Sequence, residues 1–166
     1  MNLIVIAGIK RSGSTWLFNA VRLMCEKKGS VYYDGAYREG VDVDYYIMKK
    51  HPFKLQLAQR ADVILTSDRD RDEIRASLCR FYGVKGMKMN GMIRALKEWN
   101  QHSSYCMQYE EMIKDKRKVL MDIKRALRFD NRVDINQIEL ELEDIQPPID
   151  KDYDPKTFLF KNHITK

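Results

Sequence analysis

The chain has 166 residues, of which 44% are hydrophobic and 33% are charged, a composition that is typical of a folded protein and excludes a disordered one. No apolar run reaches the length of a membrane span, and the opening residues lack the basic leader of a secretory signal, so we expect neither. The net charge of +6 favours an anionic ligand. Nucleic acid is the weaker choice, because no dense basic run is interleaved with aromatic residues.

The cysteines bear on both the compartment and the metal content. Cys25, Cys79 and Cys106 are widely spaced and odd in number. This pattern argues against a disulfide framework and against a zinc site, and it predicts a cytoplasmic protein without a bound metal.

Short apolar runs alternate along the chain with amphipathic segments. The apolar runs predict strands at residues 3–7, 30–34, 45–49, 62–67 and 104–109. Apolar residues at helical spacing predict helices over about 17–28, 54–61, 70–82, about 92–99 and 118–129. The alternation predicts one α/β domain over residues 1–166, a three-layer sandwich with a mostly parallel central sheet. In such sheets ligands bind at the carboxyl ends of the strands.

The first of these strand ends carries the sequence GIKRSGSTW, residues 8–16. Gly8 and Gly13 have the spacing of a phosphate-binding loop between a strand and a helix. Cationic and hydroxyl side chains that suit an anion surround the second glycine: Lys10, Arg11, Ser12, Ser14 and Thr15. Nucleoside triphosphatases place a lysine directly after the second glycine, and Ser14 stands there instead, which makes magnesium-dependent phosphoryl transfer doubtful. The alternative for this loop is a tight turn with a serine cap.

The stretch KRSGSTWL resembles the 5′-phosphosulfate loop of the cytosolic-type sulfotransferases, Lys-Ser-Gly-Thr-Thr-Trp-Leu. Arg11 then takes the place of the family lysine, and Ser12, Gly13, Thr15 and Trp16 match. The resemblance implies a P-loop-like sulfotransferase fold and a sulfate donor, 3′-phosphoadenosine 5′-phosphosulfate (PAPS), that needs no metal and leaves 3′-phosphoadenosine 5′-phosphate (PAP) as product. It also implies that Trp16 packs on the adenine, whereas the residue alone is equally consistent with ordinary core.

A second patch, IMKKHPF at residues 47–53, is similar to the family's Lys-Thr-His-Leu-Pro segment. The resemblance implies that Lys49 is the catalytic lysine and His51 the general base. Histidine suits a base because its pKa lies near neutrality, and a cation stabilises charge on a departing oxygen. Without the other motifs, His51 reads as a surface loop residue.

Two later patches complete the resemblance. Residues 63–82 are similar to the family's strand–Arg-Asp-Pro-Arg-Asp–helix element, which implies that Arg69 and Ser77 bind the 3′-phosphate. The alternative is a solvated, charged start of a helix. The stretch CMQYEEM, residues 106–112, resembles a Tyr-Glu-Asp-Leu patch, which implies that Tyr109 lies near the adenine and that Glu110 is structural.

The match ends before the family's late Arg-x-Gly segment, so we expect a compact or a truncated member. Lys161, His163 and Lys166 offer a partial substitute, although a solvated tail is the favoured interpretation. Residues 31–48 lie between the loop and the proposed base, so we expect acceptor contacts there, or else simple strand packing, from Tyr32, Tyr33, Tyr37 and Arg38.

The sequence therefore predicts a PAPS-dependent sulfotransferase acting on a small-molecule or glycan acceptor. One rival is a P-loop kinase with a degenerate loop and Asp68 as its metal ligand. The other is a nucleotide-binding module without catalysis.

Overall fold

The computed structural model describes residues 1–83 and 89–161. Its main sheet has five strands in the order β2-β3-β1-β4-β5, and every neighbouring pair is parallel. The strands are β1 (Asn2–Gly8), β2 (Val31–Asp34), β3 (Tyr45–Lys50), β4 (Val63–Asp68) and β5 (Tyr105–Gln108). All five lie where the apolar runs predicted them, to within two residues at either end.

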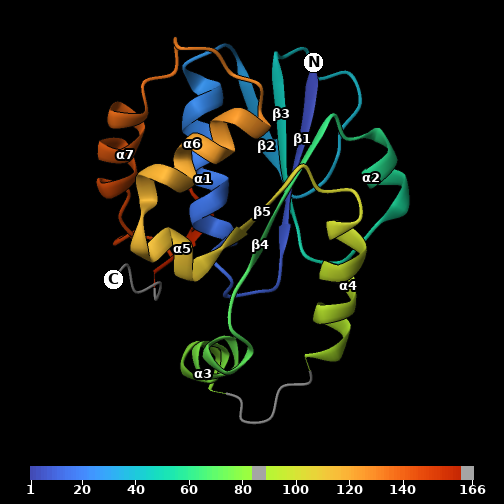
Figure 1. Ribbon diagram of the computed structural model, residues 1–166, viewed down its shortest axis with the longest axis vertical. Helices are drawn as coiled ribbons and strands as arrows, with labels where there is room; N and C mark the ends of the chain where they lie inside the picture. Colours follow the sequence, from blue (N-terminus) through green and yellow to red (C-terminus); the bar gives the residue numbers. More distant parts are fainter. Residues whose placement is uncertain (84–88, 162–166) are drawn as a thin grey trace.

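Helices cover both faces of this sheet (Figure 1). One face carries α1 (Ser14–Glu26), α5 (Tyr109–Lys114), α6 (Lys116–Ala126) and α7 (Ile135–Glu143). The other face carries α2 (Leu55–Arg60) and α4 (Asn90–Asn100). The helix α3 (Arg71–Tyr82) lies beyond the carboxyl ends of the strands. The predicted three-layer α/β sandwich is confirmed.

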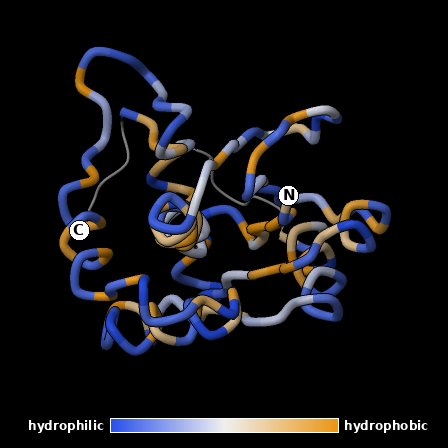
Figure 2. Tube along the Cα trace, turned by 90° about the horizontal axis from the view of Figure 1, so that it is seen from above, coloured by the Kyte–Doolittle hydropathy of each residue, from blue (hydrophilic) through white to orange (hydrophobic). Residues whose placement is uncertain are grey.

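The central strand β1 shows why the sheet sits between two helical layers. Its side chains alternate between the faces, as they do in any strand. Ile4 and Ile6 pack with α1, α5, α6 and α7, whereas Leu3, Val5 and Ala7 pack with α2 and α4. Because both faces are buried, the strand reads as a continuous apolar run rather than an alternating one. Figure 2 shows mostly hydrophilic turns around a more hydrophobic interior.

The sequence prediction misses four elements in the C-terminal part of the chain. Tyr109 begins α5 and does not end β5, so the predicted strand over 104–109 is wrong at its last residue. The helix α7 carries only two buried residues, Ile135 and Ile138, and this is too weak a stripe to stand out. The antiparallel pair β6 (Tyr153–Asp154) and β7 (Leu159–Phe160) consists of two-residue strands. We call residues 153–160 the C-terminal hairpin.

In the part of the chain that the structure describes, no helix is both long and apolar enough to cross a membrane. Cys25, Cys79 and Cys106 are all free thiols.

Candidate functional site

A cavity of about 650 Å³ lies at the carboxyl ends of the strands. Its residues come from the loop after β1, from α1, from or just after the ends of β3, β4 and β5, from α3, from α7 and the segment after it, and from the C-terminal hairpin. Two groups of lining residues matter below. The cationic wall consists of Lys10, Arg11, Lys49 and Arg69. The apolar wall consists of Phe81, Tyr82, Leu142, Ile145, Tyr153, Phe158, Leu159 and Phe160.

The two glycines of the loop after β1 are needed because neighbouring atoms come close to them. A Cβ on Gly13 would lie 2.8 Å from Cδ2 of Tyr109 and 3.0 Å from Cε of Met107. Gly13 also has a φ of 86°, in the left-handed region that favours glycine. A Cβ on Gly8 would lie 2.8 Å from the carbonyl oxygen of Ser67. The spacing read from the sequence therefore reflects two sites of close backbone packing.

The N-terminus of α1 opens into this cavity and suits an anion. Gly13 is the residue before the helix, no side chain caps the first turn, and no acidic residue lies in it. Ser14, Thr15 and Trp16 form that turn and all line the cavity. The backbone N–H groups of a first helical turn have no partner within the helix, and the helix dipole adds partial positive charge.

The three hydroxyl residues of the loop have different partners. Ser12 is fully buried and does not line the cavity, because its hydroxyl donates to the carbonyl of Ile9 (2.6 Å) and hydrogen-bonds the hydroxyl of Ser67 (2.7 Å). Its side chain ties the loop to β4. Ser14 and Thr15 line the cavity, and the Thr15 hydroxyl accepts from Lys49.

Arg11 combines an unusual backbone conformation with a side chain that is held in place. Its φ is 70°, which is uncommon for a residue with a Cβ and is found at functional sites where the surroundings enforce it. The Arg11 Nε donates to the hydroxyl of Ser77 (3.0 Å), and the guanidinium lies 4.6 Å from the ring centre of Phe81. Burial lowers the pKa of Arg11. Ser77, which sequence spacing alone could not place, therefore meets the loop through Arg11.

Arg69, from the third motif, lies beside Tyr109, from the fourth. Its guanidinium is 4.0 Å from the ring centre of Tyr109, and its Nη1 donates to the carbonyl of Arg11 (3.4 Å). The side chain is also paired with Glu73, at 2.6 Å. Only 14% of the Arg69 side chain is exposed, so this cation is positioned before any ligand arrives.

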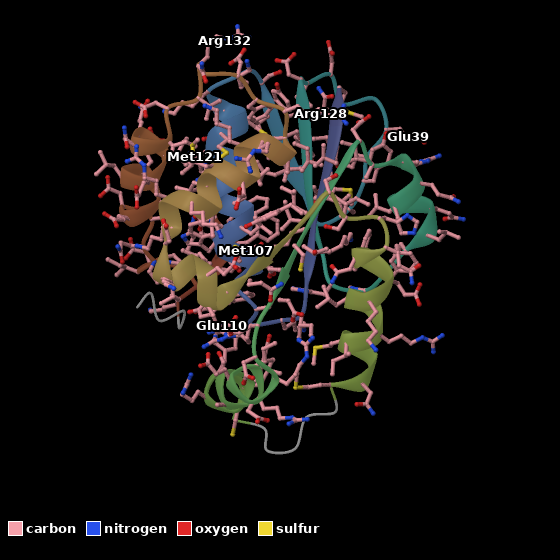
Figure 3. The ribbon with its side chains drawn as sticks, in the orientation of Figure 1. Glu39, Met107, Glu110, Met121, Arg128 and Arg132 are labelled. Atoms are coloured by element: carbon pink, nitrogen blue, oxygen red, sulfur yellow. The ribbon has the colours of Figure 1, made fainter. Side chains whose placement is uncertain are left out.

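The acidic residues near these strand ends are engaged elsewhere. The Asp68 carboxylate is paired with Arg71 and accepts from the backbone N–H of Arg69. Glu110 accepts from the backbone N–H of Asp70 (2.9 Å), so its role is structural, and Figure 3 shows it beside α3. Among the described residues that line the cavity, none is Asp or Glu. No group of three metal-ligating His, Cys, Asp or Glu side chains occurs within residues 1–83 and 89–161.

Lys49 projects from the end of β3 toward the loop. Its Nζ donates to the hydroxyl of Thr15 (2.5 Å) and lies 5.5 Å from the ring centre of Phe158. Burial, and secondarily the charge of Arg11, lowers the pKa of Lys49 to about 7. The amine is therefore near the balance between its charged and neutral forms at neutral pH.

One ring nitrogen of His51 is fixed by a hydrogen bond, and the other makes none with the residues that the structure describes. Its Nδ1 lies 2.7 Å from the carbonyl of Gly8, and since a carbonyl only accepts, the hydrogen must be on Nδ1. The same tautomer leaves Nε2 with a lone pair. Burial, together with the charges of Lys49 and Lys10, lowers the pKa of His51 to about 4, so the ring is neutral at pH 7.

Two of the remaining predicted residues line the cavity, and three do not or lie outside the described residues. Trp16 and Lys10 both line the cavity, and Lys10 places its Nζ 5.7 Å from the ring centre of Tyr82. Lys161 is exposed, whereas His163 and Lys166 lie outside the described residues.

The segment expected to contact the acceptor does not line this cavity. The aromatic rings of Tyr32 and Tyr37 lie 5.1 and 5.4 Å from Tyr46, and Tyr33 packs against Phe18 at 6.0 Å. Arg38 pairs with Asp34 (2.9 Å). The three tyrosines therefore pack within the fold, as the alternative expects, whereas Arg38 is an exposed loop residue.

Sequence reasoning missed the apolar wall and one polar residue, Asn19. The wall comes from α3, α7 and the C-terminal hairpin, which no short motif connects. Asn19 lines the cavity and is buried among the apolar residues of α1. The sequence did carry one signal for Asn19: it lies among apolar residues at helical spacing, and a polar side chain on the buried face of a helix must find hydrogen-bond partners.

Comparison with known proteins supports the fold. No protein-family model matches the chain, and no curated protein matches its sequence. A matching solved structure is that of a retinol dehydratase in complex with androsterone and the inactive cofactor PAP, with a TM-score of 0.60 and 13% identity. The match covers 84% of this chain and 64% of the dehydratase chain, so the present chain spans less than two thirds of that protein. At this identity the likeness shows the fold alone, and it confirms the predicted sulfotransferase-like α/β fold.

Proposed function

We propose that this protein transfers a sulfuryl group from PAPS to a hydroxyl or amine acceptor. The observation that carries the proposal is that one cavity joins residues from all four sequence motifs. Arg11 and Thr15 come from the first motif, Lys49 and His51 from the second, Arg69 from the third and Tyr109 from the fourth.

The chemistry of this cavity fits a donor that is charged at both ends of an adenosine. The uncapped first turn of α1 and Arg11 suit the 5′ phosphosulfate. Arg69 suits the 3′-phosphate. Ser77 supports this position indirectly, because it accepts a hydrogen bond from Arg11, whose carbonyl in turn accepts one from Arg69. Trp16 and Tyr109 supply aromatic surfaces for the adenine. The absence of carboxylates from the described lining residues avoids repulsion of these anionic groups.

Each proposed catalytic residue is already oriented by a bond to the protein. When bound, the donor supplies an electrophilic sulfur and a nucleotide leaving group. His51 acts as the general base and takes the proton of the attacking hydroxyl or amine at Nε2, because Nδ1 donates its own hydrogen to the carbonyl of Gly8. Lys49 and Arg11 stabilise the negative charge that develops at the departing oxygen. An anionic ligand beside Lys49 favours its charged form, which is the form that this role requires.

The acceptor would occupy the part of the cavity that the bound donor does not fill. The apolar wall carries no charged side chain, so it would receive the body of a small organic acceptor and not a highly charged one.

The experiment is a screen for transfer of labelled sulfate from PAPS to pooled acceptors that include phenols, sugars, lipids and peptides. We expect label on at least one pool, and no dependence on added magnesium. A parallel thermal-shift assay compares PAP with ATP plus magnesium. Stabilisation by PAP without label transfer would favour a binding module, and stabilisation by ATP plus magnesium alone would favour a kinase.

A further inference from the structure

Asn19, on α1, uses its side-chain amide to join two segments that lie far apart in the sequence. Its Nδ2 donates to the carbonyl of Thr15 (3.0 Å) and to the carbonyl of Thr157 (2.8 Å), in the C-terminal hairpin. Its Oδ1 accepts from Nε of Arg22 (3.4 Å), and Glu26 holds that guanidinium at 2.8 Å. Asn19 is 2% exposed, so these bonds are shielded from water.

Each of the two carbonyls belongs to a segment that contacts Lys49. Thr15 itself accepts the hydrogen bond from the Lys49 amine (2.5 Å). Thr157 precedes Phe158, whose ring centre lies 5.5 Å from the same amine. Phe158 has a φ of 56° and packs edge-on against Phe18 at 4.5 Å. A backbone in this region is costly for a residue with a Cβ, so the neighbouring bonds and contacts must hold it there.

We propose that Asn19 is a positioning residue that ties the C-terminal hairpin to α1 and so keeps Thr15 and Phe158 around the amine of Lys49. The catalytic consequence rests on the proposed function, since it assumes that Lys49 serves sulfuryl transfer. The structural part of the proposal concerns this chain alone.

The hairpin changes the environment of Lys49 in a measurable way. Removing the tie admits water to the amine and moves its pKa from about 7 upward, toward the ordinary lysine value. The other charged or titratable groups that line the cavity around Lys49 are Lys10, Arg11, His51, Arg69, Tyr82, Tyr109 and Tyr153. None of these is a carboxylate that would itself raise the pKa of Lys49.

The test labels amines of the unliganded protein with limiting acetic anhydride across a pH series, and reads each lysine by mass spectrometry. The exposed Lys97 serves as the internal standard. The midpoint is the pH at which labelling of Lys49, relative to that of Lys97, reaches half of its maximum. In Asn19→Leu we expect this midpoint to lie about 1 unit or more above that of the wild type. Asn131→Leu, at an exposed turn, should leave the midpoint unchanged.

A second variant keeps the test decisive if Asn19→Leu fails to fold. Phe158→Ala leaves the Thr157 carbonyl in place but removes the ring beside Lys49, and the midpoint should again rise. A folded Asn19→Leu protein with the wild-type midpoint would overturn the proposal. If Asn19→Leu does not fold, a folded Phe158→Ala protein with the wild-type midpoint would overturn the proposal.

Activity separates this proposal from the proposed function. If the wild type transfers sulfate, Asn19→Leu should lower kcat at least ten-fold and change the KM for PAPS less than about three-fold. An unchanged kcat would overturn the catalytic consequence. A shifted midpoint in a protein whose wild type transfers nothing would support the structural tie and contradict the sulfotransferase assignment.

Discussion

The cationic wall and the apolar wall differ in how their side chains are held. Arg11 is bonded to Ser77, Lys49 to Thr15 and Arg69 to Glu73. The apolar wall is instead held by ring contacts, such as Phe81 with Tyr82 at 4.8 Å, Phe81 with Phe160 at 6.0 Å and Tyr153 with Phe160 at 4.8 Å. Directional bonds fix the position of an atom, whereas ring contacts allow a surface to adjust its shape. Under the proposed function, the cationic wall would bind the donor and carry the chemistry, and the apolar wall would accommodate the acceptor.

The largest effect should come from His51, beside the cationic wall. His51→Ala should lower transfer by about 10²- to 10⁴-fold, the usual contribution of a general base. PAP affinity should change little, because His51 contributes no cation at neutral pH. Initial rates and calorimetry check the two parts.

The matched control is His102→Ala, at an exposed turn where the ring stacks on Phe53. It should retain wild-type transfer. Equal losses in both variants would remove His51 from the mechanism.

The pH dependence of kcat/KM tests the same wall without a mutation. A neutral His51 is required, and its pKa of about 4 keeps it neutral as the pH falls through 6.5, so the acidic limb should lie well below 6. A charged Lys49 is also required, so kcat/KM should fall as the pH rises through about 7. An acidic limb centred near 6.5 would contradict the described environment of His51.

Arg69→Gln should have the next largest effect. It removes a charge-assisted contact to the 3′-phosphate, which is worth about 1.5–3 kcal/mol, or roughly 10- to 100-fold in PAP affinity. Arg75→Gln is the matched control, because Arg75 lies on α3, which begins just after Arg69, but is exposed and paired with Asp72. Similar weakening in both variants would mean that net charge, rather than position, determines binding.

Gly13→Ala tests the turn on which the cationic wall depends. The added Cβ meets Tyr109 and Met107 and the φ of 86° is unfavourable for alanine, so the free energy of unfolding should fall by about 1–2 kcal/mol. Gly91→Ala, in the first turns of α4 where a Cβ meets no atom of the described residues within 4 Å, should be neutral or slightly stabilising. Urea unfolding measures both, and equal values would contradict the account of this turn.

The smallest effect should come from the rim of the apolar wall. Phe160→Ser, at a side chain that is 43% exposed, should raise the KM of the acceptor about 2- to 5-fold and leave that of PAPS unchanged. Ile149→Ser, which is 81% exposed and does not line the cavity, is the control. A larger effect on PAPS than on the acceptor would reverse the assignment of the two walls.

The two walls also differ in how far the sequence predicts them. Every residue of the cationic wall lies at or just after a strand, and apolar runs locate strands well, so the sheet brings Lys10, Arg11, Lys49 and Arg69 together in a predictable way. The contact between Arg11 and Ser77 was beyond prediction from spacing, because it depends on where α3 packs. The charged residues at the start of α3 would have the same sequence pattern whether or not the helix packs against the loop after β1.

The apolar wall could not be predicted, because its members share no motif. Phe158 lies in a turn between two-residue strands and owes its position to Phe18 and Asn19, which are about 140 residues away in the chain. The aromatic residues of 31–48 were the more visible candidates, yet they pack within the fold. Local patterns identify strand ends, whereas a wall built from distant segments requires the tertiary structure.

The most direct test of the central claim compares PAP with AMP by titration calorimetry in EDTA. The two nucleotides differ only in the 3′-phosphate, which the account assigns to Arg69. We predict one-to-one binding of PAP at least ten-fold tighter than that of AMP, with no change when magnesium replaces EDTA. Equal affinities, or binding that appears only with magnesium, would contradict a cavity built for a nucleotide charged at both ends.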